Sequence, residues 1–222
     1  MSDIVAMSFS LDAMFKIIAV VLAAAAVTAN ASAQTAVQKF AASMSGKCVK
    51  FHYSFVTASK VSVKGEGDAR VQGNSFVTTF GGVSIYCDGV TRWTADNEAR
   101  EVIVEPVNDG SGMSVSIDPA VIVGDVDRHF RVTSSVRVSE GGRALEKVSL
   151  LPLDSSMGIS GMTIWFTTSS APVPVKASVK AKDGAVTDFT IPSMTFSAEM
   201  PMSSFRFGDK SGDASWVVTD LR

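Results

Sequence analysis

Residues that could carry acid–base or nucleophilic chemistry are few in this chain of 222 residues, and their spacing matches no catalytic motif. The sequence holds no GxSxG nucleophile elbow, no SxxK pair and no HExxH zinc motif. His52 alternates with apolar residues and should face solvent, and His129 lies between arginines in an expected solvated patch. Two histidines and two cysteines are too few for a zinc cluster. We therefore expect a protein that is not an enzyme and that binds no cofactor or metal.

Composition points to a folded chain whose partners are not nucleic acids. Hydrophobic residues make up 46% of the sequence and charged residues 19%, which is enough apolar material for a sizeable core. Lys and Arg number 20 against 22 Asp and Glu, so the net charge is −2. A nucleic-acid-binding domain needs a basic surface to neutralise phosphates, and this balance does not supply one.

The first 33 residues have the pattern of a secretory signal peptide. A single cation, Lys16, precedes the apolar run 17–27, and the small residues Ala31 and Ala33 form a small-x-small pattern with cleavage expected after Ala33. The apolar run is too short to span a membrane as an anchor. Because residues 1–13 carry acidic charge and no lysine or arginine, we interpret them as a misannotated extension. We expect a periplasmic protein whose mature part, residues 34–222, is a single domain.

The remaining chain alternates apolar and polar residues with a period of two, after one short amphipathic helix predicted at 34–47. Glycine- and asparagine-containing turns separate the alternating segments, so consecutive strands should pair in an antiparallel manner. A second short helix is predicted at 118–123. The expected fold is mainly β with a few helices: a single strongly curved antiparallel sheet of ten or more strands, an incomplete half-barrel covered by short helices. Expected strands begin at Val49 and continue at 61–71, 75–80, 83–87, 90–94, 101–105, 130–139, 143–153, 162–168, 175–182, 185–191 and 205–207.

The two cysteines leave two alternatives open. Cys48 begins the first predicted strand and Cys87 ends the fourth, so both lie at one end of the sheet, three strands apart. At ~4.8 Å per strand, about 14 Å would separate them in a flat sheet, which is too far for a disulfide. Strong curvature could close that gap, so either a disulfide or two buried thiols is compatible with the sequence.

Several short motifs, in this order, resemble those of the LolA family of periplasmic lipoprotein carriers. They are FHYSF at 51–55, GEGD at 65–68, DGVTRW at 88–93, DPAVI at 118–122 and SFRF at 204–207. The resemblance implies an incomplete barrel with a helical lid around an apolar cavity. The family's Lys-Arg-Pro run after the second strand is absent here, so the role of its arginine in holding the lid is not carried over to any residue.

The resemblance implies a carrier that binds the acyl chains of lipoproteins and delivers them to the outer membrane. Its partners would be acylated lipoproteins, an inner-membrane lipoprotein-releasing transporter and an outer-membrane lipoprotein acceptor, and the carrier itself would be a monomer. A sensory or regulatory envelope protein with the same fold, and a structural protein whose core is filled, are the alternatives. Strand alternation leads us to expect these cavity residues: Phe51, Tyr53, Phe55, Phe76, Ile85, Trp93, Ile103, Trp165 and, from the lid, Val121 and Ile122.

Overall fold

The structure, a computed structural model, describes residues 34–59, 62–107, 123–124, 126–208 and 213–222. Residues Gln34–Arg222 form one compact unit. Within the described residues no helix is long and apolar enough to cross a membrane. The strands are β1 Lys47–Ala58, β2 Val63–Gln72, β3 Ser75–Phe80, β4 Val83–Cys87, β5 Thr91–Asp96, β6 Glu101–Pro106, β7 Phe130–Glu140, β8 Arg143–Pro152, β9 Ile159–Thr167, β10 Pro174–Ala181, β11 Val186–Thr190, β12 Met194–Ala198 and β13 Val217–Asp220.

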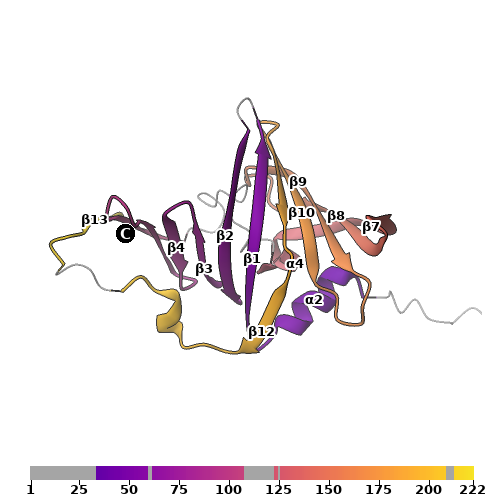
Figure 1. Ribbon diagram of the computed structural model, residues 1–222, viewed down its shortest axis with the longest axis horizontal. Coiled ribbons are helices and arrows are strands. Elements are labelled where there is room, and N and C mark those ends of the chain that lie inside the picture. The colour runs from indigo at the N-terminus through magenta and orange to yellow at the C-terminus, as the bar shows by residue number, and fades with distance from the viewer. Residues whose placement is uncertain (1–33, 60–61, 108–122, 125, 209–212) are drawn as a thin grey trace, which may run out of the picture. The chain divides into compact units, whose positions relative to one another are not determined.

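These strands form one open, curled sheet in the order β13-β6-β5-β4-β3-β2-β1-β11-β10-β9-β8-β7, and β12 also pairs with β1 (Figure 1). The predicted single sheet of ten or more strands is therefore confirmed. Neighbouring strands are antiparallel, with the exception of β13, which pairs in parallel with β6. Strand β1 lies at the centre because β2 pairs along one side of it, while β11 and β12 share the other side.

Tight turns at glycine explain why consecutive strands pair with each other. Gly141 and Gly142, between β7 and β8, have φ of 56° and 75°. Gly81 and Gly82 form the equivalent turn between β3 and β4 with φ of 52° and 82°. Residues with a side chain rarely adopt such angles, so these positions fix where each strand must reverse.

The sheet has two faces with different covers. We call the face that carries Tyr53 the inner face and the opposite one the outer face. The main hydrophobic cluster lies on the inner face and includes residues of β1–β4 and β8–β11. At β5 and β6 the apolar side changes, because Ala95, Val102 and Val104 cluster on the outer face. The inner face is therefore apolar at the centre of the sheet and polar toward β6.

Two short helices cover part of the inner face. Helix α2 (Ala36–Met44) begins at Thr35, whose hydroxyl accepts a hydrogen bond from Gln38 N, while the Gln38 side chain accepts one from Thr35 N. This reciprocal capping box satisfies two of the donors that a helix start leaves free. The helix predicted at 34–47 is thus confirmed with shorter bounds. Helix α4 (Val126–His129) leads into β7 and was not predicted, and the helix predicted at 118–123 lies almost entirely outside the described residues.

Residues 199–208, which we call the strap, cross the outer face. Gln72 fixes the start of the strap, because its amide donates to Met200 O at 3.1 Å and accepts from Met200 N at 2.8 Å. The fully buried Phe205 packs against Cys48 and Val77. The strand predicted at 205–207 is wrong: residues Met202–Phe205 form a 3-10 helix, and Phe205 holds it to the sheet.

Both cysteines are buried, and no disulfide joins them. Cys48 clusters with Phe205 under the strap on the outer face, whereas Cys87 belongs to the inner-face cluster. Because alternate residues of a strand point to opposite sides, the sheet itself lies between the two thiols. The structure corresponds to the alternative with two buried thiols.

Candidate ligand-binding face

A row of aromatic rings on the inner face forms the centre of the candidate site. Phe51, Tyr53 and Phe55 are consecutive inward-facing residues of β1, with ring centroids 6.3 and 6.4 Å apart. Phe189 of β11 lies 6.2 Å from the Tyr53 ring and 6.1 Å from the Phe55 ring, and Phe80 of β3 meets Phe55 edge-on at 6.2 Å. These separations are within the range of favourable aromatic pairs. The row gives this face a continuous apolar surface across three strands.

The two glycines of the GEGD motif make room for the aromatic row. Gly65 lies opposite Phe55 and Gly67 opposite Tyr53 on the paired strand β2. A Cβ atom at Gly65 would lie 2.8 Å from the Phe55 ring. A Cβ atom at Gly67 would lie 1.9 Å from Thr79 O and 2.9 Å from the Tyr53 hydroxyl. Both positions therefore need a residue without a side chain, because the rings of Phe55 and Tyr53 pack directly over the backbone of β2.

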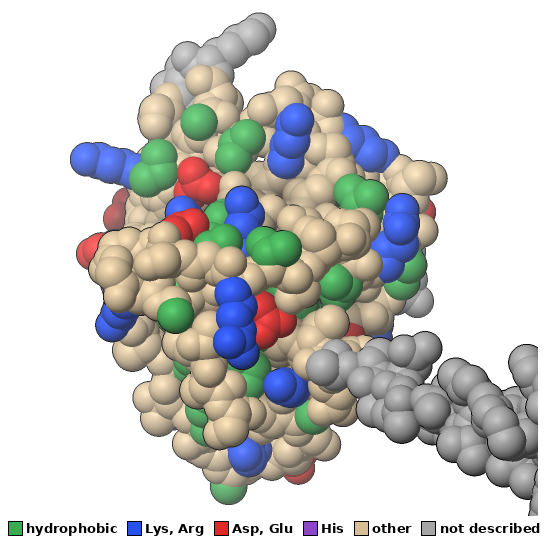
Figure 2. Space-filling model, turned by 90° about the vertical axis from the view of Figure 1, so that its right-hand side faces the viewer, with side chains coloured by type: hydrophobic (Ala, Val, Ile, Leu, Met, Phe, Trp, Pro, Cys, Tyr) green, Lys and Arg blue, Asp and Glu red, His purple; other side chains and the backbone are tan. Residues whose placement is uncertain are grey.

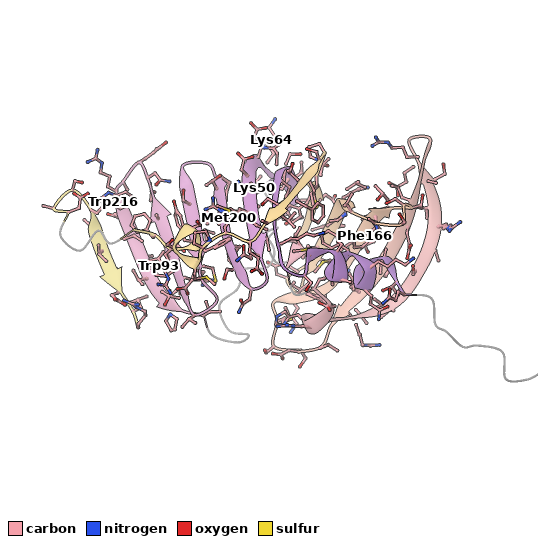
Figure 3. All side chains as sticks on the ribbon, turned by 90° about the horizontal axis from the view of Figure 1, so that it is seen from below. Lys50, Lys64, Trp93, Phe166, Met200 and Trp216 are labelled. Carbon is pink, nitrogen blue, oxygen red and sulfur yellow. The ribbon has the colours of Figure 1, made fainter. Side chains whose placement is uncertain are left out.

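Helix α2 covers the part of the inner face formed by β8 and β9. Phe40 is fully buried, and its ring centroid is 6.0 Å from that of Phe166 on β9 (Figure 3). At the start of the helix, Ala36 N donates to the Glu146 carboxylate at 3.2 Å. Ser135 donates to the same Glu146 oxygen at 2.7 Å. A carboxylate at a helix N-terminus is favourably placed for the helix dipole, so Glu146 holds the cover in position.

Methionines contribute to the inner-face cluster. Met157 and Met162 are buried in it, and Met194 packs partly against it. Methionine side chains are flexible and polarisable, so they adapt to irregular apolar shapes. Met200 and Met202 lie elsewhere, on the strap that crosses the outer face.

Most of the sequence-predicted cavity residues that the structure describes lie together on the inner face. Phe51, Tyr53, Phe55 and Phe76 are buried in its main cluster, and the half-buried Ile85 packs against them. Ile103 points to the same side from β6 but is 44% exposed, because the apolar cluster ends before that strand. Whether any of them contacts a ligand remains a prediction. Val121 and Ile122 lie outside the described residues.

The expectation for the two tryptophans is wrong, because both lie on the outer face. Trp93 is paired with Tyr86 and packs with the outer cluster of β5 and β6. On β9, Ile164 and Phe166 belong to the inner cluster, so the intervening Trp165 points the other way. Its ring has Lys176 Nζ at 4.4 Å and Lys147 Nζ at 5.3 Å, and its indole N–H donates to Glu140 at 2.7 Å.

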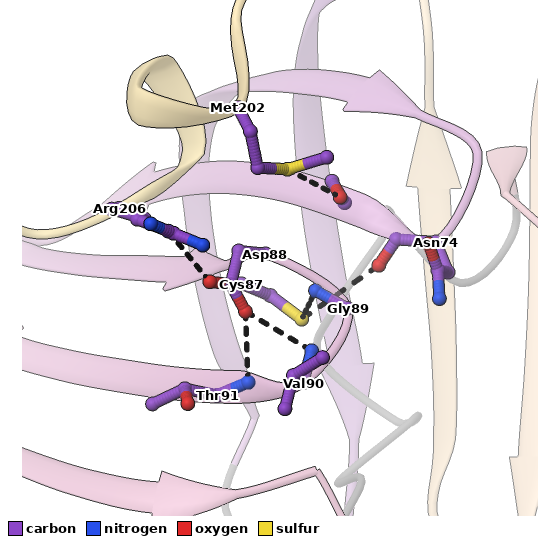
Figure 4. Close-up of polar contacts among 9 residues, drawn as sticks. Asn74, Cys87, Asp88, Gly89, Val90, Thr91, Met202 and Arg206 are labelled. Carbon is purple, nitrogen blue, oxygen red and sulfur yellow. Dashed lines mark hydrogen bonds and ion pairs between the residues drawn. The ribbon is translucent and has the colours of Figure 1, made fainter.

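The DGVTRW motif forms a structural corner between β4 and β5 (Figure 4). Asp88 accepts hydrogen bonds from Val90 N at 3.0 Å and Thr91 N at 2.9 Å, and it pairs with Arg206 of the strap at 2.7 Å. Burial raises the pKa of Asp88, but these hydrogen bonds and the arginine outweigh it and hold the pKa below its usual value. The motif therefore joins a hairpin turn to the strap and has no catalytic geometry.

The described residues contain no metal-ligand cluster on either face of the sheet. No group of three or more His, Cys, Asp or Glu side chains in this part of the chain could hold a metal ion. On the face shown in Figure 2, lysine and arginine side chains are spread out, with acidic and apolar ones between them. What the chain does present is an apolar inner face. Sequence reasoning missed six of its buried or half-buried aromatics: Phe40, Phe80, Phe130, Phe166, Phe189 and Phe196.

The open, curled antiparallel sheet with short helices on one face is an incomplete half-barrel. The chain is similar over 82% of its length, and 94% of the other chain, to an uncharacterized conserved protein of Thermus thermophilus, with a TM-score of 0.50 and 12% identity. A LolA superfamily protein of Nitrosomonas europaea matches 79% of this chain and 99% of its own, with a TM-score of 0.46 and 12% identity.

Lipoprotein LppX of Mycobacterium tuberculosis matches 70% of this chain and 91% of its own, with a TM-score of 0.38 and 13% identity. No protein-family model and no curated protein matches the chain by sequence. At these identities the similarity concerns the fold alone.

Proposed function

We propose that this protein is a non-enzymatic carrier that shields the acyl chains of lipoproteins during their transfer through the bacterial envelope. The observation that carries the proposal is the aromatic inner face of the sheet, against which α2, α4 and the residues Val107, Val123 and Met157 pack. The predicted signal peptide and the resemblance of the sequence motifs to those of the LolA family support the same function.

An acyl carrier must solve a problem of solvation. Each methylene group exposed to water costs about 0.8 kcal/mol, so about ten of them cost about 8 kcal/mol. The inner face offers what such a chain requires, namely rings and methionine side chains that can rearrange around it. Helix α2 packs on this face through side chains such as Phe40, and its displacement would leave the hydrogen bonds between strands intact.

The proposed cycle has a partner at each end. The protein takes an acylated lipoprotein from an inner-membrane transporter, carries it through the periplasm and passes it to an outer-membrane acceptor. Binding is stoichiometric and involves no cofactor. The driving force on the carrier side is burial of apolar area, so handover follows when the acceptor buries the acyl chains more completely.

Native mass spectrometry of the protein purified without detergent from a bacterial periplasm tests the proposal. We expect the mass of the mature chain, plus that of a lipoprotein or an acylated lipid. A bare mass, together with failure to take up added acylated lipoprotein, would contradict the proposed function.

Adjacent residues of β1 provide a matched pair of variants. Phe55→Asp introduces a charge on the inner face, and Ser54→Asp introduces the same charge on the outer face. We expect loss of lipid uptake in the first and unchanged uptake in the second. Because Phe55 is buried, Ile85→Asp at a half-buried inner position serves as a milder second variant. Equal uptake by all three folded variants would show that the ligand binds elsewhere.

A further inference from the structure

A groove of about 420 Å³ lies on the outer face, over the middle of strands β1 and β2. Four charged or titratable side chains line it: Lys50 and His52 from β1, and Asp68 and Arg70 from β2. The inner aromatic row lies on the opposite side of the same strands. The groove is therefore separate from the proposed acyl-binding face.

An irregularity in strand pairing explains why the outer face is hollowed here. Strand β1 pairs with β11 as far as Ser54 opposite Thr190, and with β12 from Phe51 opposite Met194. Residues 52–53 of β1 thus lie opposite residues 191–193, so the segment between β11 and β12 contains one extra residue, as in a β-bulge. The bulge contains a proline, Pro192, which has no N–H for the ladder. The hydroxyl-bearing residues Ser193 and Thr195 after it line the groove, as does Thr79 of β3.

Two cations lie directly opposite each other beside this groove. Lys50 and Arg70 are register partners on antiparallel strands, and both point to the outer face. Like charges in this arrangement destabilise a sheet. Among the described residues neither cation forms an ion pair with a carboxylate. The repulsion between the two cations is therefore not offset by a direct ion pair.

Arg70 is held in place and leaves one donor unused. Its guanidinium donates from Nη2 to Ser204 O at 2.5 Å and lies 5.4 Å from the centroid of the Phe205 ring. Its Nε is buried and has no hydrogen-bond partner among the described residues. An unsatisfied buried donor on a cation is costly. Because the strap fixes the side chain, Arg70 cannot turn away to find an acceptor.

The one carboxylate in the groove is already engaged. Asp68 lies opposite His52 in the next row of the ladder, and its oxygen is 3.2 Å from His52 Nδ1. Glu66 lies 3.9 Å from the other ring nitrogen of His52. Lys50 and Arg70 therefore remain without a direct carboxylate partner, next to the hydroxyl groups of Ser193 and Thr195.

We propose that this groove binds a phosphate group, between Lys50 and Arg70. A phosphate carries up to two negative charges and several acceptor oxygens, which matches two cationic donors and neighbouring hydroxyls better than a carboxylate does. The phosphate is either a free small solute or part of a lipid headgroup. The proposal does not depend on the acyl-carrier function, because the two sites lie on opposite faces of the sheet.

Isothermal titration calorimetry of the exported, purified protein with inorganic phosphate at low ionic strength tests this site. We expect saturable binding that weakens about tenfold in Lys50→Gln, because a charge-assisted hydrogen bond is lost. Lys64→Gln is the matched control, because Lys64 lies on the same face of β2 as Arg70, opposite Val56, and does not line the groove. Arg70→Lys keeps the charge but replaces the planar guanidinium and its several N–H donors by one ammonium, and it should also weaken binding in a folded protein.

Vesicles identify the source of the phosphate. Co-sedimentation with phosphatidylglycerol vesicles that is lost in Lys50→Gln would assign the groove to a lipid headgroup. Phosphate binding without vesicle binding would assign it to a free solute. Absence of phosphate binding would overturn the proposal. An equal loss of phosphate affinity in Lys64→Gln and Lys50→Gln would also overturn it, because such a loss would be a general effect of charge.

Discussion

The Gly67→Ala substitution tests whether the GEGD motif requires glycine because the aromatic row and strand β3 lie too close for a side chain. The added Cβ atom would lie 1.9 Å from Thr79 O, whereas ordinary contact begins at 3.4 Å. Strands β2 and β3 would have to separate by about the difference of 1.5 Å, which disrupts their hydrogen bonds at this point. The same atom would lie 2.9 Å from the Tyr53 hydroxyl, so the strain reaches the candidate site.

We expect Gly67→Ala to lower the free energy of unfolding by about 3 kcal/mol, as the sum of overpacking and of one weakened hydrogen bond. In a domain of this size that corresponds to a fall in Tm of roughly 6–12 °C. Urea titration followed by circular dichroism gives the free energy, and calorimetry gives the Tm.

Gly158→Ala is the matched control, because nothing lies within 4 Å of its added Cβ atom and its φ is ordinary. This variant should be neutral, or more stable by up to ~1 kcal/mol, since alanine restricts the unfolded chain. If Gly67→Ala unfolds at the same urea concentration as Gly158→Ala, the close approach of β2 and β3 is not what requires glycine, and our explanation of the motif fails.

Further predictions concern the strap and the outer face. Phe205→Ala should lower the free energy of unfolding by about 3–5 kcal/mol in urea titrations, because a fully buried ring is removed. The lowered pKa of Asp88 stabilises the fold above the unfolded-state pKa, and this contribution is lost as the pH falls through the folded-state pKa. Stability measured from pH 7 to pH 2 should therefore fall less in Asp88→Asn than in the unmodified protein. Burial raises the pKa of Cys48, so alkylation by iodoacetamide at pH 8 should be slow and should accelerate in Phe205→Ala; equal rates would contradict the assignment of the strap as its cover. Trp165→Ala should leave lipid uptake unchanged, and a loss of uptake would place the ligand on the outer face.

Local signals in the sequence predict most of the sheet. The hairpins depend on turns that glycine makes possible, such as that at Gly141 and Gly142, and these need no information from distant residues. The alternation in β1 also identifies its inner residues, because polar residues separate Phe51, Tyr53 and Phe55. These parts of the prediction are local, and they are confirmed.

The predictions that failed depend on pairing between distant segments. In β9, Ile164, Trp165 and Phe166 are all apolar, so alternation alone does not say which of them faces inward. The pairing of Trp165 with Lys147 and Lys176 decides it. In the same way, the alternation of Phe205 and Phe207 suggests a strand, but contacts with Cys48 and Tyr86 make these residues anchors of the strap. Strand β13 has four exposed residues and pairs with a distant strand, and it gave no local signal.

The central place of β1 has a consequence for the order in which the chain can fold. Cys48 and Ser197 belong to paired strands although 149 residues separate them in the sequence. Until the residues of β11 and β12 have emerged from the ribosome, one side of β1 has no strand to pair with. Contacts of such long sequence separation form slowly. A nascent chain of this topology therefore cannot complete the pairing of β1 until most of it has been synthesised, which is compatible with the export that the predicted signal peptide implies.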